Sequence, residues 1–150
     1  MSLINLDTSA LVKQYVQEMG SKEVQKLIKS ADHSGTSLIT RTEMAAALAR
    51  AVRMKLLPSS EAGAAWNQFL VEWSSLSRLK VSGQIIERAS ELAWEYPLRG
   101  YDAVHLASAV LWQETLETQI TLATFDRELW SAGNYVGLTV WPESLSPKYP

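Results

Sequence analysis

The sequence contains no cysteine, and this absence excludes both a disulfide scaffold and a thiolate metal site. It also has no apolar stretch near the roughly 18 residues that cross a bilayer, and its N-terminal residues show neither the basic start nor the apolar core of a signal peptide. We therefore expect a cytoplasmic protein that makes no contact with a membrane.

The sequence also lacks a large excess of positive or negative charge. The 14 basic and 16 acidic residues leave a net charge of −2 at pH 7, which argues against a protein that coats nucleic acid by bulk electrostatics. If four of the acids share one metal pocket, 14 basic residues face 12 acidic ones (16 minus 4) elsewhere, a balance compatible with a polyanionic substrate. A chain that is 47% hydrophobic and 20% charged is not disordered, and its 150 residues suit one domain over 1–150.

Short apolar runs alternate with helical patterns along the chain. The runs predict strands at 3–6, 35–40, 79–82, 120–125 and 138–141, and the tail at 144–150 is expected to be coil. Apolar spacing, glycines and prolines predict helices between them, at 9–20, 21–31, 41–57, 59–76, 83–96, 101–115 and 126–133. This alternation is typical of an α/β domain with a mainly parallel sheet of about five strands.

Four acidic residues stand near the ends of these elements. Asp7 follows the first strand, Asp126 follows the strand at 120–125, and Glu43 comes shortly after the strand at 35–40. Asp102 begins the apolar helix that leads into the strand at 120–125. Because the carboxyl ends of parallel strands meet at one edge of a sheet, we expect three or four carboxylates to share one crevice there.

Each acid also has a purely structural explanation. Asp7, Asp102 and Asp126 stand where an aspartate caps a helix N-terminus. Thr40 to Glu43 reads T-x-x-E, the pattern of a capping box in which Glu43 bonds back to the backbone of Thr40. Capping does not require the acids to lie at one edge of one sheet, and a capping residue can also bind a metal. Both interpretations therefore stay open at this point.

Several carboxylates packed together repel one another unless a cation neutralises them. A hard divalent ion with oxygen ligands suits such a site, and Mg²⁺ usually binds one or two carboxylates together with waters. Open coordination positions then remain for water and a phosphate oxygen. The resulting hypothesis is metal-assisted phosphodiester hydrolysis without a Ser, Cys or His nucleophile.

Four segments resemble the acidic blocks of the PIN-domain family, and most closely those of VapC-type toxins from bacterial toxin–antitoxin pairs. The segments are LINLDTSALVKQYV, SLITRTEMAAALAR, LRGYDAVHLASAVLW and TLATFDRELWSAG. They follow the family order with typical spacing, and the resemblance covers essentially the whole chain. It implies a three-layer α/β/α domain, an endoribonuclease that depends on Mg²⁺ or Mn²⁺, and inhibition by a cognate antitoxin.

The resemblance places the acidic positions of the family on residues of this sequence. All four are implied to be catalytic: Asp7, Glu43, Asp102 and Asp126. We expect the three aspartates to hold one or two Mg²⁺ ions, and Glu43 to help bind the metal or orient the attacking water. The family and the apolar helix pair at 41–57 and 59–76 also favour a homodimer.

Hydroxyl side chains accompany two of these acids. In the family pattern, the hydroxyl after the first acid falls on Thr8 and Ser9, and the one before the last acid falls on Thr124. Because residues two apart on a strand share a face, Thr124 is expected to point with Asp126 into the crevice and orient a carboxylate or a water. Local hydrogen bonding by Thr124 and helix capping by Ser9 are the structural alternatives.

Basic residues near the acids are candidates for contacts with RNA. They are Lys13, Arg41, Arg50 and Arg99. For Arg50 a solvated helix face is the stronger expectation. His105 stands three residues after Asp102, and we expect a packed imidazole there rather than a catalytic one.

Tryptophans in helical apolar patterns are expected in the core or at an interface. They are Trp66, Trp73, Trp94 and Trp112. Trp66 and Trp73 are seven residues apart, a spacing that suits a stripe facing a second copy or an antitoxin.

Three other assignments fit less well. A haloacid-dehalogenase-like phosphatase needs a second aspartate two residues after its first, where this chain has Ser9. A response-regulator receiver needs a lysine after a late strand, and LTVWPES offers none. A catalytically inactive PIN-fold module that binds RNA or protein would ordinarily have lost an acid. All four acids are present, so an intact nuclease is the leading interpretation.

Overall fold

The computed structural model describes residues 1–145, and residues 146–150, which include most of the predicted tail, lie outside this range. Strands and helices alternate along the described residues. The strands are β1 (Leu3–Leu6), β2 (His33–Ser37), β3 (Ser77–Leu79), β4 (Ile120–Ala123) and β5 (Thr139–Trp141). The helices are α1 (Thr8–Tyr15), α2 (Ser21–Ser30), α3 (Thr40–Arg53), α4 (Ser59–Trp73), α5 (Gly83–Glu95), α6 (Gly100–Leu116) and α7 (Arg127–Tyr135).

These strands form one parallel sheet in the order β3-β2-β1-β4-β5. At its centre, β1 pairs with β2 through Leu3↔His33 and with β4 through Leu3↔Ile120. Every residue of β1 is buried, as expected for a parallel strand that is covered on both faces. Since the strands are parallel, the carboxyl ends of β1, β2 and β4 meet at one edge of the sheet.

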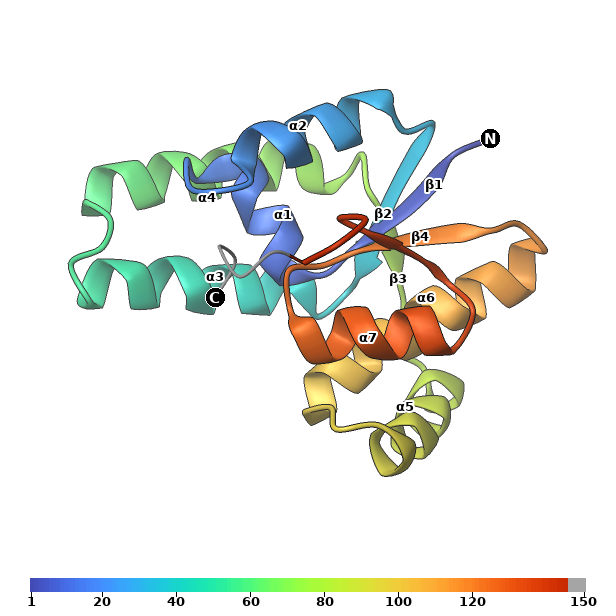
Figure 1. Cartoon of the computed structure of the whole chain (residues 1–150). Helices are drawn as coiled ribbons and strands as arrows, with labels where there is room; N and C mark the ends of the chain where they lie inside the picture. Colours follow the sequence, from blue (N-terminus) through green and yellow to red (C-terminus); the bar gives the residue numbers. More distant parts are fainter. Residues whose placement is uncertain (146–150) are drawn as a thin grey trace.

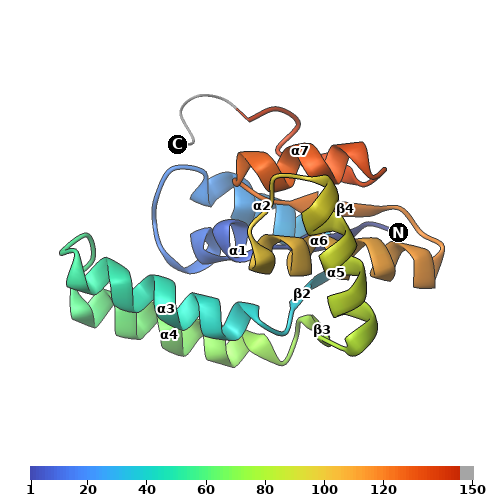
Figure 2. The same cartoon turned by 90° about the horizontal axis from the view of Figure 1, so that it is seen from below.

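Helices cover both faces of the sheet, so the predicted three-layer α/β/α fold is confirmed (Figures 1 and 2). One core joins α5, α6 and α7 to the sheet through Leu3, Ile120 and Leu122. The other core joins α1, α2, α3 and α4 to Ile4 and Leu6. Alternate residues of β1 therefore serve opposite faces, as the two-residue period of a strand requires.

Helix α6 is largely buried, as its apolar sequence predicted. Its Trp112 lies against the backbone of β2, where a Cβ added to Gly35 would stand 2.7 Å from the indole ring. A glycine at this position therefore allows the helix to pack closely on the sheet. Among the described residues no helix, α6 included, is long and apolar enough to span a membrane.

The other three tryptophans of the predicted helical patterns differ in their burial. Trp66 and Trp73 pack on Phe69, with ring centroids 5.4 and 5.3 Å apart. Trp73 is buried within the chain, so the expected stripe of two outward-facing tryptophans does not form. Trp94 is 93% exposed on α5, so it is not in the core, and an interface stays the prediction for this residue.

Several predicted boundaries shift by a few residues. The first helix ends at Tyr15 rather than 20, because Val16 is already extended and Gly20, in the left-handed conformation, is the N-cap of α2. The second strand covers His33–Ser37 rather than 35–40, and the third covers Ser77–Leu79 rather than 79–82. None of these shifts moves the four acids away from the carboxyl edge of the sheet.

Candidate functional site

Asp7 and Asp126 follow neighbouring parallel strands, and each begins the next helix. Asp7 comes directly after β1, and its Oδ1 accepts a hydrogen bond from the Ala10 backbone N–H at 3.0 Å. Asp126 comes shortly after β4, and its Oδ1 accepts one from the Leu129 N–H at 2.9 Å. Both residues are therefore helix N-caps. Capping fixes two of the predicted carboxylates at one edge of the sheet, so the two interpretations of these residues are compatible.

Asp7 is almost completely buried in a polar network. The Ser9 hydroxyl donates to Asp7 Oδ1 at 2.7 Å and lies 2.9 Å from Oδ2, and the Thr124 hydroxyl donates to Oδ2 at 2.7 Å. Burial raises the pKa of Asp7 above its ordinary value, although the charge of His105 and these hydrogen bonds act in the opposite direction. The ionised carboxylate is thus costly here, and a bound cation would lower that cost.

Ser9 and Thr124 also join the loops that follow β1 and β4. The Ser9 hydroxyl accepts a hydrogen bond from the Phe125 N–H at 3.0 Å, and the Thr124 hydroxyl accepts one from the Asp126 N–H at 3.1 Å. The sequence predicted that Thr124 points with Asp126. In the structure its hydroxyl reaches the Asp7 carboxylate, while Asp126 contributes only its backbone N–H to this contact.

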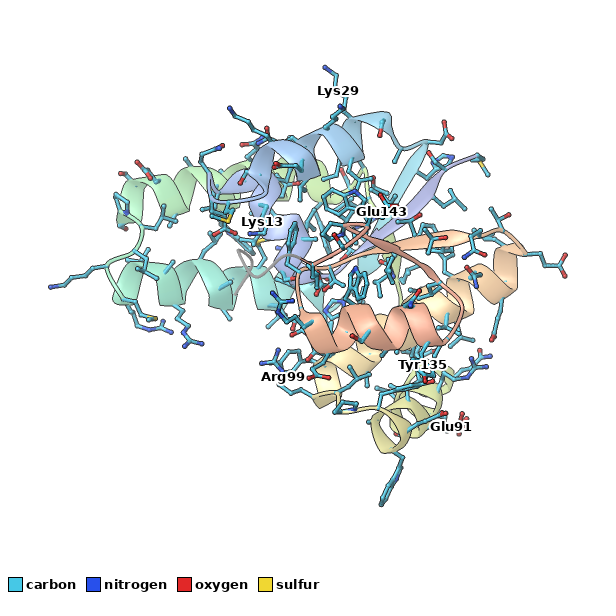
Figure 3. The ribbon with its side chains drawn as sticks, viewed as in Figure 1. Lys13, Lys29, Glu91, Arg99, Tyr135 and Glu143 are labelled. Carbon is cyan, nitrogen blue, oxygen red and sulfur yellow. The ribbon has the colours of Figure 1, made fainter. Side chains whose placement is uncertain are left out.

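Asp102 lies in the first turn of α6 and does not cap that helix, whose N-cap is Arg99. Arg99 Nε donates to Asp102 Oδ2 at 2.9 Å, and Arg99 Nη2 donates to Asp126 Oδ2 at 3.1 Å. Burial raises the pKa of Asp102, Arg99 opposes this effect, and the Asp126 charge adds to it. One largely exposed guanidinium, beside the start of α7 in Figure 3, therefore bridges two of the predicted acids.

Glu43, on α3, is held by residues from two other elements. Its Oε1 accepts hydrogen bonds from Thr8 Oγ1 at 2.8 Å and from His105 Nε2 at 2.5 Å. Thr8 adjoins Asp7 at the start of α1, and His105 stands one helical turn after Asp102 on α6. These two bonds link Glu43 to the elements that carry two of the other acids.

The capping box predicted from Thr40 and Glu43 does not form. The N-cap of α3 is Ile39, and no side chain caps this helix. The Thr40 hydroxyl instead lies 2.6 Å from the Thr36 hydroxyl. Tertiary contacts replace the local motif, and they direct the Glu43 carboxylate toward α1 and α6.

Sequence reasoning missed the contact between His105 and Glu43. The imidazole is only 2% exposed, as expected for a packed residue. Burial lowers the pKa of His105, but the bond to Glu43 and the charges of Asp7, Glu43 and Asp102 raise it overall. Burial raises the pKa of Glu43, but His105, Thr8 and Arg99 lower it overall. A single histidine on an apolar helix gave no sequence signal that separates this contact from simple packing.

The four basic candidates lie at different places around the acids. Arg99 forms the bridge described above. Lys13 bonds to Glu18 and the Met19 carbonyl, in a hollow that Asp126 also lines. The Arg41 guanidinium stands 6.0 Å from the Trp66 ring centroid, over α4. Arg50 lines a groove along α3 that begins at the acids.

We call this the α3 groove. It has a volume of about 580 Å³, and the residues that contribute to its lining include Thr8, Glu43, Arg50, Met54, Leu56 and Tyr101.

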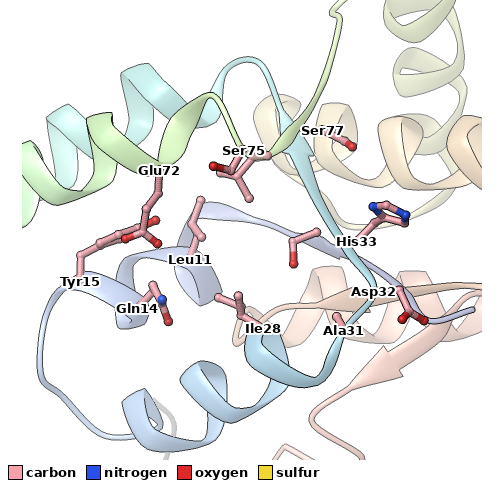
Figure 4. Close-up of a pocket in the computed structure, with 12 residues that line it drawn as sticks. Leu11, Gln14, Tyr15, Ile28, Ala31, Asp32, His33, Glu72, Ser75 and Ser77 are labelled. Carbon is pink, nitrogen blue, oxygen red and sulfur yellow. The ribbon is translucent and has the colours of Figure 1, made fainter.

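Another pocket lies at the opposite edge of the sheet, between α1, α2, α4 and the start of β2 (Figure 4). Its volume is about 280 Å³. Tyr15 and Glu72 approach each other across it, and burial together with Glu72 raises the pKa of Tyr15. None of the predicted site residues lines this pocket, so the carboxyl edge is the candidate site.

The donor chemistry at the carboxyl edge fits a divalent cation. Asp7, Asp102 and Asp126 present carboxylate oxygens, the ligands that hard cations prefer. A positive group, the Arg99 guanidinium, already bridges Asp102 and Asp126. Within residues 1–145, no three acidic or histidine side chains are arranged around a common point as ready-made metal ligands. A metal ion at this site would therefore compete with Arg99 for the two carboxylates.

Comparison with known proteins agrees with the fold. The model of the PIN domain family matches residues 4–133. Two relatives from Mycobacterium tuberculosis, Ribonuclease VapC45 (strain CDC 1551 / Oshkosh) and Ribonuclease VapC49 (strain ATCC 25618 / H37Rv), are each 33% identical to this chain. Each comparison spans 150 residues, 98% of this chain and 100% of the relative.

A solved structure shares the fold. The structure of VapBC2 from Rickettsia felis, bound to a DNA fragment from its promoter, superimposes with a TM-score of 0.63 and 16% identity, over 92% of this chain and 96% of that one. Together with the match over residues 4–133, the parallel sheet and the four acids at its carboxyl edge, these comparisons show that the chain belongs to the PIN domain family.

Proposed function

We propose that this chain is a divalent-metal-dependent endoribonuclease and the toxin of a toxin–antitoxin pair. The observation that carries the proposal is the set of four acids, which Arg99, Ser9, Thr124, Thr8 and His105 connect to one another. Membership of the PIN domain family, and 33% identity to two proteins named ribonucleases, support RNA as the substrate. The VapC names of these relatives support the assignment as a toxin.

The three aspartates are the proposed metal ligands. Asp7, Asp102 and Asp126 would hold Mg²⁺, or Mn²⁺ as the alternative. When bound, the ion lowers the pKa of a water and stabilises negative charge on the phosphate that is cleaved. Ser9 and Thr124 hold the Asp7 carboxylate in a fixed orientation, because they donate to its two oxygens.

Glu43 is proposed to help bind the metal or to orient the attacking water. The bonds from Thr8 and His105 both fall on Oε1 and fix the carboxylate from two sides. The same bonds lower the pKa of Glu43, so the carboxylate is ionised and can accept a hydrogen bond from the water. His105 acts through Glu43 and is a positioning residue.

The basic residues are proposed to bind the RNA backbone. Arg99 is exposed beside Asp102 and Asp126, where the scissile phosphate would enter, and its guanidinium can exchange a carboxylate for a phosphate. Lys13 and Arg50 lie in two hollows that each include one of the acids. Arg41 lies over α4 and contributes charge at longer range.

Two protein partners complete the proposal. The relatives named VapC support a cognate antitoxin that inhibits the nuclease. A homodimer is proposed from the family resemblance. The alternative function is a PIN-fold module that binds RNA or protein without cleaving it.

A cleavage assay with the purified chain tests the proposal. Single-stranded RNA is incubated with the wild type in EDTA, in Mg²⁺ and in Mn²⁺, and the products are separated on a denaturing gel. We expect cleavage only with metal, and its loss in Asp102→Asn. The matched control is Asp32→Asn, which changes an acid outside the carboxyl edge and is expected to cleave like the wild type. Cleavage in EDTA would refute the metal mechanism, and its absence under every condition would favour the binding module.

A further inference from the structure

The α3 groove is continuous with the acids but is not needed to explain hydrolysis. Thr8 and Glu43 line one end of it, and Arg50, Met54 and Leu56 line it two or more helical turns further along α3 and just beyond. Its volume of about 580 Å³ exceeds what one phosphate and its waters require. A bound nucleic-acid strand with one phosphate at the acids therefore has room to continue along this groove.

The charge along this groove suits a polyanion. Among the described residues that line the groove, Glu43 at the acid end and Arg50 further along are the charged ones, so the part of the groove beyond the acids carries a positive charge. Within residues 1–145, no carboxylate lies within ion-pair distance of Arg50; its Nε donates instead to the Met54 sulfur at 3.4 Å, a weak acceptor. The Arg50 guanidinium is therefore available to a phosphate.

An exposed aromatic ring also lines the groove. Tyr101, on the first turn of α6, lines the groove and is 43% exposed. The Arg99 guanidinium lies 4.7 Å from the centroid of its ring. Because the ring is 43% exposed, an unpaired base can stack on the face that the guanidinium does not cover.

We propose that the α3 groove binds the single-stranded RNA that flanks the cleaved bond, with an unpaired base stacked on Tyr101 and a phosphate bound by Arg50. This assignment rests on the proposed function, since it takes RNA as the substrate. The groove thereby favours unpaired over duplex RNA, because a paired base does not present its face to the ring.

Binding without cleavage tests the proposal. Fluorescein-labelled ten-nucleotide RNAs, single-stranded and duplex, are titrated with the protein in EDTA, and anisotropy gives the Kd at several salt concentrations. Tyr101→Ala is expected to weaken binding of the single strand at least about fivefold, the lower limit for stacking of one base, while Tyr101→Phe stays near the wild type. Arg50→Ala is expected to reduce the slope of log Kd against log salt by about 0.7, the value for one phosphate contact.

Matched variants separate the groove from general effects. Tyr135 is an exposed tyrosine at the end of α7 (Figure 3), and Arg53 is a second arginine on α3 that does not line the groove. We expect Tyr135→Ala to bind RNA like the wild type, and Arg53→Ala to weaken binding less than Arg50→Ala. Binding that is unaffected in Tyr101→Ala and Arg50→Ala, or equally weakened in the controls, would overturn the proposal.

The outcomes also distinguish this proposal from the proposed function. A wild type that cleaves RNA, with groove variants that bind normally, would refute the groove alone. Groove-dependent RNA binding without cleavage by the wild type would refute the nuclease and leave the groove in place. A change in sedimentation mass in the groove variants, with normal RNA binding, would assign this surface to contact between copies of the chain and overturn the RNA assignment.

Discussion

Replacement of Thr124 by valine tests whether the hydroxyl network supports the Asp7 carboxylate. Valine keeps the branched shape of threonine and replaces the hydroxyl by a methyl group that can neither donate nor accept a hydrogen bond. That hydroxyl is completely buried, donates to Asp7 Oδ2 at 2.7 Å and accepts from the Asp126 N–H at 3.1 Å. Both partners lose a hydrogen bond in Thr124→Val, and no solvent reaches the position to replace it.

The expected loss of stability follows from these contacts. A hydrogen bond to a charged group contributes about 1.5–3 kcal/mol, and we expect Thr124→Val to lose about this amount of unfolding free energy at neutral pH. For a chain of this size the melting temperature falls by about 2–4 °C per kcal/mol, which gives a decrease of about 3–12 °C. Thr124→Ser keeps the hydroxyl and loses only a buried methyl, worth about 1 kcal/mol.

The pH dependence separates these two variants. The Thr124 hydroxyl favours the ionised form of Asp7, so its removal raises the pKa of Asp7 further in the folded state. The loss in Thr124→Val is therefore smaller below pH 3.8, the ordinary pKa of Asp7, where the unpaired Asp126 N–H still contributes, and it grows as the pH rises through the higher folded value. Urea denaturation at acidic and neutral pH measures both variants. A loss in Thr124→Val that does not depend on pH, or that equals the loss in Thr124→Ser at neutral pH, would refute this reasoning.

Four further predictions concern the acids and their partners. Because burial raises the pKa of Asp7, Asp7→Asn is expected to be more stable than the wild type in urea at neutral pH without metal, with the gain absent below pH 3.8; equal stability at both pH values would contradict this. Mg²⁺ at 100 times its Kd is expected to stabilise the wild type by about 2.7 kcal/mol, a rise in melting temperature of about 5–11 °C, and to leave Asp102→Asn unchanged. Arg99→Gln removes the cation that competes for Asp102 and Asp126, so calorimetry is expected to show tighter Mg²⁺ binding, and weaker binding would show that Arg99 does not compete. His105→Gln keeps a donor for Glu43 and is expected to retain a kcat for RNA cleavage within about tenfold of the wild type, whereas His105→Leu loses about 10²–10⁴-fold in kcat with little change in KM; equal activity of the two variants would exclude the positioning role.

Those parts of the fold that depend on local pattern could be predicted from the sequence. Alternating apolar runs and helical periodicity identified the parallel sheet and its covering helices, because burial on both faces leaves a strong signal in strands such as β1. The predicted ends of the helices and strands were less accurate. The change at Val16 to extended backbone, which ends the first helix early, has no clear mark in the sequence.

Those parts of the site that depend on tertiary contact could not be predicted. The capping motif at Thr40 and Glu43 was a sound local expectation, but Thr8 and His105, from α1 and α6, take the Glu43 carboxylate. The bridge from Arg99 to Asp102 and Asp126 joins residues 27 positions apart, and no periodicity records such a contact. Sequence position located the acids, while the partners that set their orientation and pKa emerged only from the fold.

The central claim is that the acids at the carboxyl edge cleave RNA. Genome-wide mapping of new RNA 5′ ends, after a brief pulse of expression in a host without the antitoxin, tests it most directly. The wild type is compared with Asp102→Asn, which removes one proposed metal ligand and keeps a side chain of the same size. We predict discrete new 5′ ends with the wild type alone, and their sequences would identify the target RNA. Identical maps from two equally folded and equally abundant proteins would contradict the nuclease assignment.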